Sequence, residues 1–374
     1  MKYEYTHFID KNVAPKGATR IVVESGNKEV CSIPAARFGD LTPPEGEPLY
    51  SFGLISDTHL APGTLANDGT NLGTLVSTRL DNALTWYEER GVRFVAICGD
   101  VTNVGFDNPR GTYDPVQFEE YKAIRQKHPN LPVYSVTGNH DNYHDGLMIR
   151  YCESQGKFYH EMWKEYTDPE RYIASDTVEY DGILNLNYTK TVEHDGVKDL
   201  YIFMSMTTNA VLYADGSTTP LAEYVWLENQ LKGNPTGRNF VFWHPIFRND
   251  SGNPLGLHTA PNYMPEGYAE NTLISILASY KNTVLFHGHA HWAPWLQELD
   301  PLTNYSYNHG FHSVHVPSLG QGAILDEQGA FNKTHYEGYG YLVDVYQDCI
   351  CLRGRDFVRN EWLGIGTYRI EVTA

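Results

Sequence analysis

Polar side chains that can bind metal ions or carry protons follow several apolar runs of this sequence. The clearest stretch, Gly138-Asn139-His140-Asp141, comes directly after the apolar run 133–136. Glycine lets the backbone turn sharply there. The amide oxygen of Asn139 can ligate a hard metal ion, the imidazole of His140 can carry a proton, and Asp141 can fix the imidazole tautomer. The stretch therefore predicts a functional loop at the end of a buried strand.

Four further apolar runs lead into side chains of the same kind. They end at Ile55, Cys98, Trp243 and Phe286. In an open parallel sheet the carboxyl ends of the strands converge on one crevice, so separate segments can bring these groups to one point. The side chains that follow the four runs are Asp57 and His59, Asp100, His244, and His289 with His291.

These residues, with Asn139, form a donor set of two carboxylates, one amide and four imidazoles, without a thiolate. Nitrogen and oxygen donors of this kind suit Mn, Fe or Zn, and the set is too rich in nitrogen for calcium or magnesium. Seven donors are too many for one tetrahedral ion, but two ions that share a carboxylate would use them all. Two ions roughly 3.5–4 Å apart form the clamp used for in-line displacement at phosphorus. Burying these carboxylates and imidazoles without a cation would be costly.

Helical and strand patterns alternate around these loops. Because strand, helix, strand, helix and strand follow one another, the segment 49–136 predicts a parallel α/β sheet. An antiparallel pair is expected over 184–192 and 200–206. The other expected elements are helices at 75–90, 115–127, 157–166, 221–231 and 273–280, and strands at 49–55, 94–98, 133–136, 240–243, 283–286, 338–346, 350–357 and 368–372.

Residues 1–48 read as a short β appendage with a linker, followed by one catalytic domain over 49–374. A hairpin is expected from Arg20–Glu24 and Glu29–Ile33, and the linker contains Thr42-Pro43-Pro44-Glu45-Gly46. Within the domain, the tyrosine-rich segment 142–182 interrupts the alternation, so we expect a lid or substrate wall there.

The ordered series DxH, GD, GNHD, H and GHxH, over residues 49–320, resembles the calcineurin-like metallophosphoesterase family. The resemblance implies an α/β fold, a four-layer α/β/β/α sandwich with helices outside two sheets. It also implies two metal ions and attack on a phosphoester by a hydroxide that bridges them. The implied ligands are Asp57, His59, Asp100 and His291 for one ion, and Asp100, Asn139, His244 and His289 for the other, with Asp100 bridging.

The resemblance further implies that His140 protonates the leaving oxygen or stabilises the equatorial phosphate oxygens, and that Asp141 orients it. Asn103 either contacts the phosphate or caps the following turn. In the family, the strand equivalent to 201–206 often ends in an acidic residue, but here Met204-Ser205-Met206 stands in its place. The remaining histidines are expected to pack or lie at the surface, with His287 next to the ligands.

A phosphodiester is the expected substrate, because no arginine clamp for a dianionic phosphate lies near the motifs and the long insert suits an organic group on the leaving side. A phosphomonoesterase of the same fold is the alternative. A non-catalytic metal-binding scaffold is a weaker alternative, because the ligands and the proton donor are intact.

Bulk composition narrows the choice of partners and compartment. The 374 residues carry a net charge of −18, which argues against docking on nucleic acid or anionic membrane through a basic face. The five cysteines contain no CxxC pattern and read as free thiols. No secretory signal or membrane span is recognisable, so we expect a cytoplasmic or otherwise non-secreted protein. Residues 1–48 could attach it to a larger assembly such as a virion.

Overall fold

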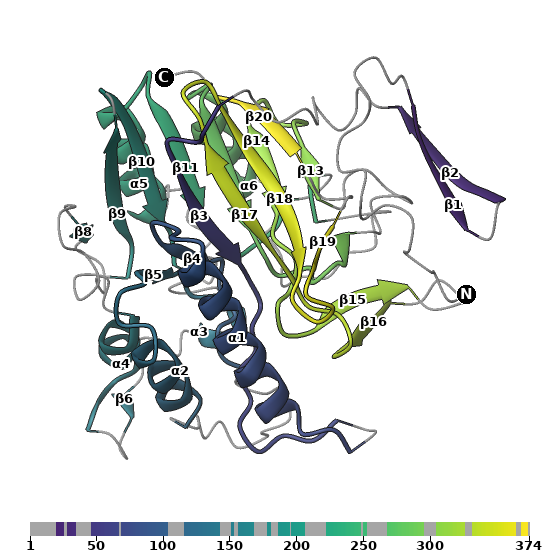
Figure 1. The fold of residues 1–374 in the computed structure, drawn as a ribbon. Coiled ribbons are helices and arrows are strands. Elements are labelled where there is room, and N and C mark those ends of the chain that lie inside the picture. Colours follow the sequence, from purple (N-terminus) through teal and green to yellow (C-terminus); the bar gives the residue numbers. More distant parts are fainter. Residues whose placement is uncertain are drawn as a thin grey trace.

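Two seven-stranded sheets form the centre of the computed structural model (Figure 1). The structure describes residues 20–25, 28–34, 46–66, 69–103, 116–142, 151–152, 156–167, 178–180, 186–194, 196–205, 222–247, 250–252, 268–294, 304–325, 331–363 and 368–372.

The first sheet combines the first parallel strands of the chain with its C-terminal strands. Its order is β19-β18-β17-β3-β4-β5, and β20 pairs with β18. β3, β4 and β5 are parallel, whereas β17 runs antiparallel to β3. The strands are β3 (Tyr50–Ile55), β4 (Val95–Ile97), β5 (Val133–Ser135), β17 (Tyr339–Val345), β18 (Cys349–Asp356), β19 (Glu361–Trp362) and β20 (Tyr368–Glu371).

The second sheet has the order β13-β14-β12-β11-β10-β9-β8. Its central strands β10, β11, β12 and β14 are parallel, and β9 is antiparallel to β10 as the sequence predicts. The strands are β8 (Val178–Tyr180), β9 (Tyr188–His194), β10 (Val197–Phe203), β11 (Arg238–Phe242), β12 (Thr283–His287), β13 (Tyr305–Ser306) and β14 (His312–His315).

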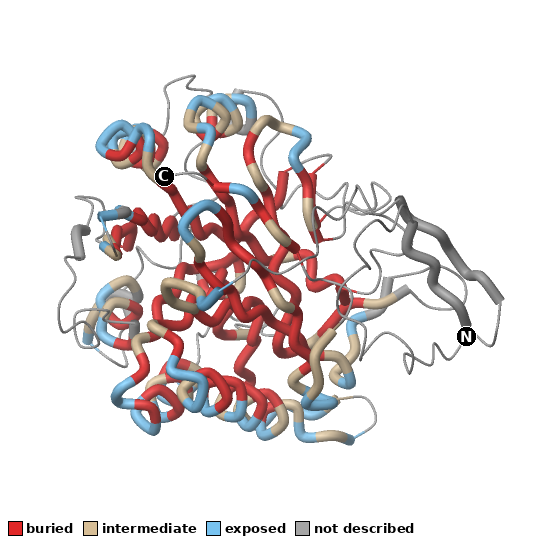
Figure 2. Tube along the Cα trace, turned by 45° about the horizontal axis from the view of Figure 1, so that its top comes forward, coloured by how far each residue is buried: buried red, intermediate tan, exposed pale blue. Residues whose placement is uncertain are grey.

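Helices cover the outer face of each sheet. One layer contains α1 (Leu72–Glu89), α2 (Val116–Gln126) and α4 (Tyr159–Thr167), and the other contains α5 (Ala222–Gly233) and α6 (Tyr268–Ala278). Their outward surfaces are exposed, while the strands between them are buried (Figure 2). The structure thus has the four-layer α/β/β/α order that the family resemblance implies.

Three apolar clusters lie between the four layers, and side-chain alternation along each strand assigns residues to them. On β3, Ile55 packs with α1, α2 and α4, whereas Phe52 and Leu54 face the second sheet. On β11, Phe240 and Phe242 face the first sheet, and Val241 packs under α5 and α6. Because both faces of these strands are buried, they read as continuous apolar runs rather than alternating ones.

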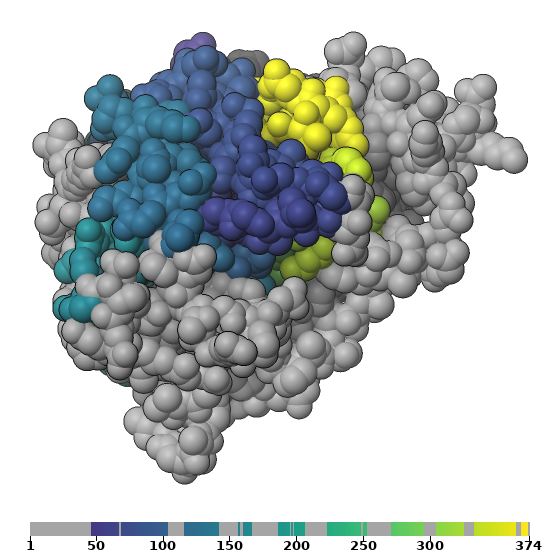
Figure 3. All heavy atoms as spheres, turned by 90° about the horizontal axis from the view of Figure 1, so that it is seen from below, coloured from purple at the N-terminus to yellow at the C-terminus, as the bar shows by residue number. Residues whose placement is uncertain are grey.

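Segments from opposite ends of the chain meet in the first helical layer. Trp86 of α1 packs edge-on against Phe357 and Trp362, with ring centroids 5.6 and 5.3 Å apart. Figure 3 shows this side, where the early part of the chain (blue and purple) lies beside the C-terminal strands (yellow). The C-terminal strands are therefore part of the same sandwich as the motif-bearing segment.

Three small two-stranded sheets complete the described structure. β1 (Arg20–Ser25) and β2 (Lys28–Pro34) form the expected N-terminal hairpin, and β6 (Tyr151–Cys152) pairs with β7 (Lys157–Phe158). β15 (Gly322–Leu325) pairs with β16 (Phe331–Thr334) in a hairpin that was not among the elements predicted from the sequence.

The structure describes only some of the residues on which the other sequence predictions fall. Three of the cysteines, Cys98, Cys349 and Cys351, are described and free. Most of the expected lid at 142–182 lies outside the described residues. No helix in the described part of the chain is long and apolar enough to span a membrane.

Candidate metal centre

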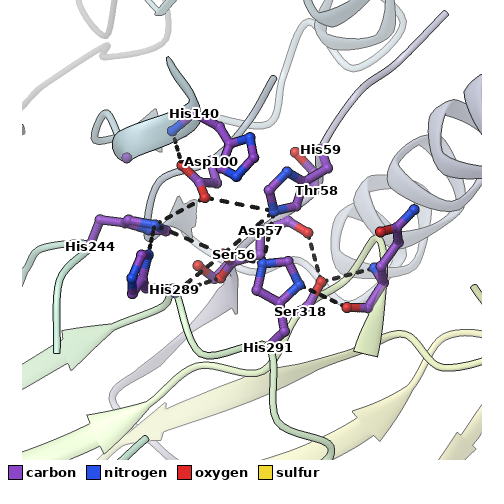
Figure 4. Close-up of polar contacts among 12 residues, drawn as sticks. Ser56, Asp57, Thr58, His59, Asp100, His140, His244, His289, His291 and Ser318 are labelled. Carbon is purple, nitrogen blue, oxygen red and sulfur yellow. Dashed lines mark hydrogen bonds and ion pairs between the residues drawn. The ribbon is translucent and has the colours of Figure 1, made fainter. Parts of the chain in front are cut away.

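Six of the seven predicted ligands lie in loops or turns at the carboxyl ends of strands (Figure 4). The seventh, Asn139, begins the short helix α3 (Asn139–Asn142), which follows β5. The first sheet supplies its ligands after β3, β4 and β5, and the second sheet supplies its ligands after β11 and β12. The two sheets thus meet at one polar point. Asp57, His59, Asp100 and Asn139 come from the first sheet, and His244, His289 and His291 from the second.

One group of four side chains surrounds a single point. It consists of Asp57, His59, Asp100 and His291, whose ligand atoms all lie within 4.8 Å of one another. The Nε2 atoms of His59 and His291 are 2.9 Å apart, and Asp57 Oδ1 is 3.1 Å from Nε2 of His291. All four side chains are buried. Nitrogen and carboxylate donors in this arrangement could hold one transition-metal ion.

A second group lies next to the first and shares Asp100 with it. Its ligand atoms, from Asp100, His244 and His289, lie within the same 4.8 Å limit. Nε2 of His244 is 3.1 Å from Asp100 Oδ2 and 3.2 Å from Nδ1 of His289. The amide oxygen of Asn139 is 3.1 Å from Nε2 of His244. The predicted amide ligand therefore lies beside this second group.

Asp100 is positioned to serve both groups. Its Oδ1 accepts a hydrogen bond from the backbone N–H of His140 at 2.8 Å. Its Oδ2 lies 3.1 Å from His244 and 3.7 Å from His59, so this oxygen faces both sets of imidazoles. This is the placement that a bridging carboxylate requires.

Backbone carbonyl groups orient two of the ligand histidines. Nδ1 of His244 donates to the carbonyl oxygen of Cys98 at 2.7 Å, and Nδ1 of His291 donates to the carbonyl oxygen of Gln321 at 2.8 Å. In a neutral imidazole the lone pair is then on Nε2, the nitrogen that points into each ligand group. Hydrogen bonds of this kind are typical of metal-binding histidines.

The backbone is strained at most of these positions. Among the described residues, the non-glycine residues with positive φ are Asp57, His59, Asp100, His289, His291 and Asn360, with φ from +48° to +74°. An L-residue in this region costs free energy, and such strain is kept where the surroundings and the function hold it. Five of the six positions are candidate ligands. This strain is independent of donor chemistry and supports the same assignment.

The glycines of the motifs allow the ligand loops to cross closely. A Cβ atom on Gly138 would lie 2.2 Å from Oδ1 of Asp100, and one on Gly288 would lie 1.9 Å from Oγ of Ser56. Any side chain at these two positions would displace the loop that carries Asp100 or Asp57.

The two carboxylates stay ionised and attract positive charge. Burial works to raise the pKa of Asp57 and Asp100, but the neighbouring histidines outweigh it and hold both below the ordinary value. Burial lowers the pKa of His244, whereas Asp100 and Asp57 raise it, with a net rise to about 9. Burial and the charge of Lys333 lower the pKa of His291 to about 4. The donor chemistry, ring orientation and charge of the site all fit metal cations.

Asp141 joins two segments of the site through its hydrogen bonds. Its carboxylate accepts hydrogen bonds from the backbone N–H groups of Val101, Thr102 and Gly138 at 3.2, 2.9 and 2.8 Å, and from the Thr102 hydroxyl at 2.9 Å. Its described hydrogen bonds do not include the His140 imidazole. Asp141 therefore joins the segments that carry His140 and Asp100, and its predicted orientation of the His140 imidazole stays a prediction.

The remaining polar candidates lie around the ligand groups. The backbone N–H of Asn103 donates to the carbonyl oxygen of Leu60 at 3.0 Å, and the carbonyl oxygen of Asn103 accepts from the Gln117 side chain at 3.2 Å. Both bonds use the backbone, so the contact of the Asn103 side chain with phosphate stays a prediction. His287 is buried, and its Nε2 lies 2.7 Å from Oγ of Ser251. In place of the family's acidic residue, Ser205 Oγ accepts the backbone N–H of Thr137 at 3.2 Å.

Sequence reasoning missed two contributors to the site. Oγ of Ser318 donates to the carbonyl oxygen of Asp57 at 2.8 Å, which supports a strained ligand. Nζ of Lys333, on β16, lies 3.1 Å from Nε2 of His291. The ligands were predicted because metal-binding residue types directly follow apolar runs. Ser318 and Lys333 belong to no such motif, so this pattern could not predict them.

A family model for calcineurin-like phosphoesterases matches residues 50–293 of this chain. The chain belongs to this family. As a calcineurin-like phosphoesterase it is a hydrolase of phosphoric esters from a family that depends on a dinuclear metal centre, and the two ligand groups that share Asp100 provide the candidate centre.

Solved structures with a similar fold include two phosphatases. A dimetal phosphatase from Danio rerio is 13% identical with a TM-score of 0.54, over 87% of this chain and 99% of that chain. The purple acid phosphatase PPD1 from yellow lupin (Lupinus luteus) seeds is 13% identical with a TM-score of 0.50, over 88% of this chain and 55% of that chain. At these identities the likeness shows the fold alone. No curated protein matches the chain.

Proposed function

We propose that this phosphoesterase cleaves a P–O bond at the two ligand groups that share Asp100. When bound, two Mn, Fe or Zn ions would supply an activated water for in-line attack and would neutralise charge on the phosphate. The observation that supports this most strongly is Asp100 itself, whose Oδ2 faces both sets of imidazoles. Asp57, His59 and His291 would complete one ligand set, and Asn139, His244 and His289 the other.

His140 is the group we assign to the substrate oxygens. Its ring lies edge-on to the His59 ring with centroids 4.6 Å apart, beside the first ligand group. Burial lowers the pKa of His140 well below its ordinary value, although Asp100 works in the opposite direction. A neutral imidazole can donate its N–H to a phosphate oxygen but is a poor source of a free proton. Of the two roles that the resemblance implies, this favours stabilisation of the equatorial oxygens.

The charge near the site bears on the substrate class. The expectation of a diester rests partly on the lack of an arginine clamp near the motifs. A different cation, Lys333, lies 3.1 Å from His291. A fixed ammonium group favours a doubly ionised phosphate. We therefore propose a phosphomonoester as the preferred substrate. A diester is the second candidate, and the tyrosine-rich segment 142–182 supports it.

A pair of chromogenic esters separates these candidates. We expect metal-loaded protein to hydrolyse p-nitrophenyl phosphate with a higher kcat/KM than bis-p-nitrophenyl phosphate. The reverse preference would establish the diester as the substrate class. Hydrolysis of neither ester, nor of a broader phosphoester panel, by protein with a full metal content would favour the scaffold alternative.

The proposed role of residues 1–48 is separate from catalysis. The β1–β2 hairpin pairs with no strand of the two large sheets in the described structure. We propose that this segment contacts a larger assembly, and that residues 49–374 form the catalytic domain. Light scattering on the full chain and on a version that starts at residue 49 tests this, because a partner contact predicts a change in association and intrachain packing does not.

A further inference from the structure

Lys333 reaches the metal centre from the surface of the molecule. The residue lies on β16 and is exposed overall, yet its Nζ is 3.1 Å from Nε2 of the candidate ligand His291. His291 is 42 residues away in the sequence and lies in the loop that follows β12. The side chain therefore runs inward from an exposed strand, and its ammonium group lies beside a metal-binding residue.

Two hydrogen bonds to His291 hold the β15–β16 hairpin against the site. Ala323, which lies opposite Lys333 in the ladder, donates its N–H to the carbonyl oxygen of His291 at 2.7 Å. Just before β15, the carbonyl oxygen of Gln321 accepts the Nδ1 proton of His291 at 2.8 Å. The hairpin that carries the lysine is therefore attached to the same histidine that the lysine contacts.

Arg79 of α1 fixes both ends of this hairpin. Its guanidinium donates to the carbonyl oxygens of Gly320 at 2.8 Å on one side and His335 at 2.8 Å on the other, with further bonds to Leu319 and Glu337 at 3.0 and 3.1 Å. Arg79 is buried. A polar anchor of this kind keeps the hairpin in one position, so the place of Lys333 does not depend on its own side chain alone.

Asp57 and Asp100 attract the ammonium group of Lys333, so charge balance accounts for part of its position, but the direct contacts of Lys333 are different. In the described part of the chain Lys333 has no ion pair with a carboxylate, and its polar contact is an imidazole nitrogen. An ammonium group cannot ligate a metal ion, and its charge weakens cation binding nearby. A lysine held here needs a different partner, and it offers three N–H donors to an anion.

We propose that Lys333 is a substrate-binding residue whose ammonium group donates to a non-bridging oxygen of the substrate phosphate. This inference rests on the proposed phosphoester function. If Nε2 of His291 holds a metal ion, its lone pair is no longer available to Lys333, and an oxygen of a phosphate in the same site is the acceptor within reach. A terminal phosphate with two negative charges gains more from this contact than a diester with one.

The direct test is the affinity of the metal-loaded full chain for inorganic phosphate, measured by calorimetry. We expect Lys333→Met to weaken phosphate binding about 10- to 100-fold, the usual range for a hydrogen bond to a charged group. Lys333→Arg keeps the charge and should stay within about fivefold of the wild type. Lys198→Met, which removes an exposed strand lysine at the start of β10, should leave phosphate binding unchanged.

Two further measurements separate substrate binding from a structural effect. Metal content should be unchanged or higher in Lys333→Met, because the substitution removes a competing positive charge. In steady-state kinetics the variant should raise KM for p-nitrophenyl phosphate more than for bis-p-nitrophenyl phosphate. Lys333→Gln provides a second charge-free variant in case Lys333→Met folds poorly.

Unchanged phosphate affinity in both charge-free variants, at wild-type metal content, would overturn the proposal, and so would loss of metal from them. If the wild type binds phosphate but hydrolyses no ester, the proposed function fails, while the phosphate titration still decides the role of Lys333. A metal-loaded wild type that binds no phosphate contradicts the role of Lys333, while ester hydrolysis decides the proposed function separately.

Discussion

At the scale of single residues, the site is built from side chains whose backbone is held in an unfavourable conformation. Asp57, Asp100 and His291 all have positive φ, and none of them is glycine. Donor type and position after an apolar run are visible in the sequence, so the ligands could be predicted. The strain, the bond from Ser318 to Asp57 and the approach of Lys333 depend on contacts between distant segments, and no local pattern encodes them.

Replacement of His140 by asparagine tests its assignment to the substrate oxygens. The backbone N–H bond from residue 140 to Asp100 does not depend on the side chain, so the metal ligands should stay in place. We expect kcat to fall about 10²- to 10⁴-fold with an unchanged metal content. Steady-state kinetics and elemental analysis on the same sample measure both. His194→Asn, on β9, is the control, and a kcat near that of the wild type in His140→Asn would remove the residue from the mechanism.

At the scale of elements, the site depends on how closely loops from neighbouring strands approach. The loop after β5 crosses the loop after β4, where Gly138 lies against Asp100 and Asp141 accepts hydrogen bonds from both loops. The sequence indicated the sharp turn at Gly138. It did not reveal that Asp141 is used to join the loops, because a carboxylate beside a histidine fits an orienting role equally well.

Gly138→Ala tests this crossing. The new Cβ would lie 2.2 Å from Oδ1 of Asp100, so the carboxylate or the loop must move. We expect a loss of about 1–3 kcal/mol in the free energy of unfolding and a reduced metal content. Gly233→Ala is a matched control, because a Cβ there meets nothing within 4 Å. Denaturant titration and elemental analysis measure the two effects, and full metal content in Gly138→Ala would show that the crossing is not tight.

At the scale of the whole molecule, the sequence predicts elements better than it predicts their partners. The parallel segment from β3 to β5 and the β9–β10 pair follow from pattern and spacing. The division into two sheets does not, because every central strand is buried on both faces and reads as a similar apolar run. β17 pairs with β3 although Tyr341 and Leu54 are far apart in the chain. Only the family resemblance supplied the four-layer order.

The packing of α1 beside α2 includes an ion pair whose pH dependence can be measured. Burial works to raise the pKa of Asp81, but hydrogen bonds from Lys127 and His128, at 2.7 and 2.9 Å, outweigh it and lower the pKa. A carboxyl group with a lowered folded-state pKa stabilises the fold above its unfolded pKa of about 3.9 and loses this contribution as the pH falls through the folded value.

Asp81→Asn should therefore reduce the free energy of unfolding at pH 7 by about 0.5–1 kcal/mol. The difference from the wild type should shrink as the pH falls below about 3.9. Urea titrations at several pH values measure this, with the exposed turn residue changed in Asp348→Asn as the control. A difference that stays constant down to the lowest pH would show that the charge of Asp81 contributes nothing.

The central claim is that Asp100 joins two metal sites, and the metal content of Asp100→Asn tests it most directly. After loading with Mn, Fe or Zn and removal of excess metal, the wild type should retain about two ions per chain, one for each ligand group. The variant, in which an amide replaces the shared carboxylate, should retain fewer than one and lose phosphoesterase activity by about 10³-fold or more. Two tightly held ions and undiminished activity in the variant would contradict the account.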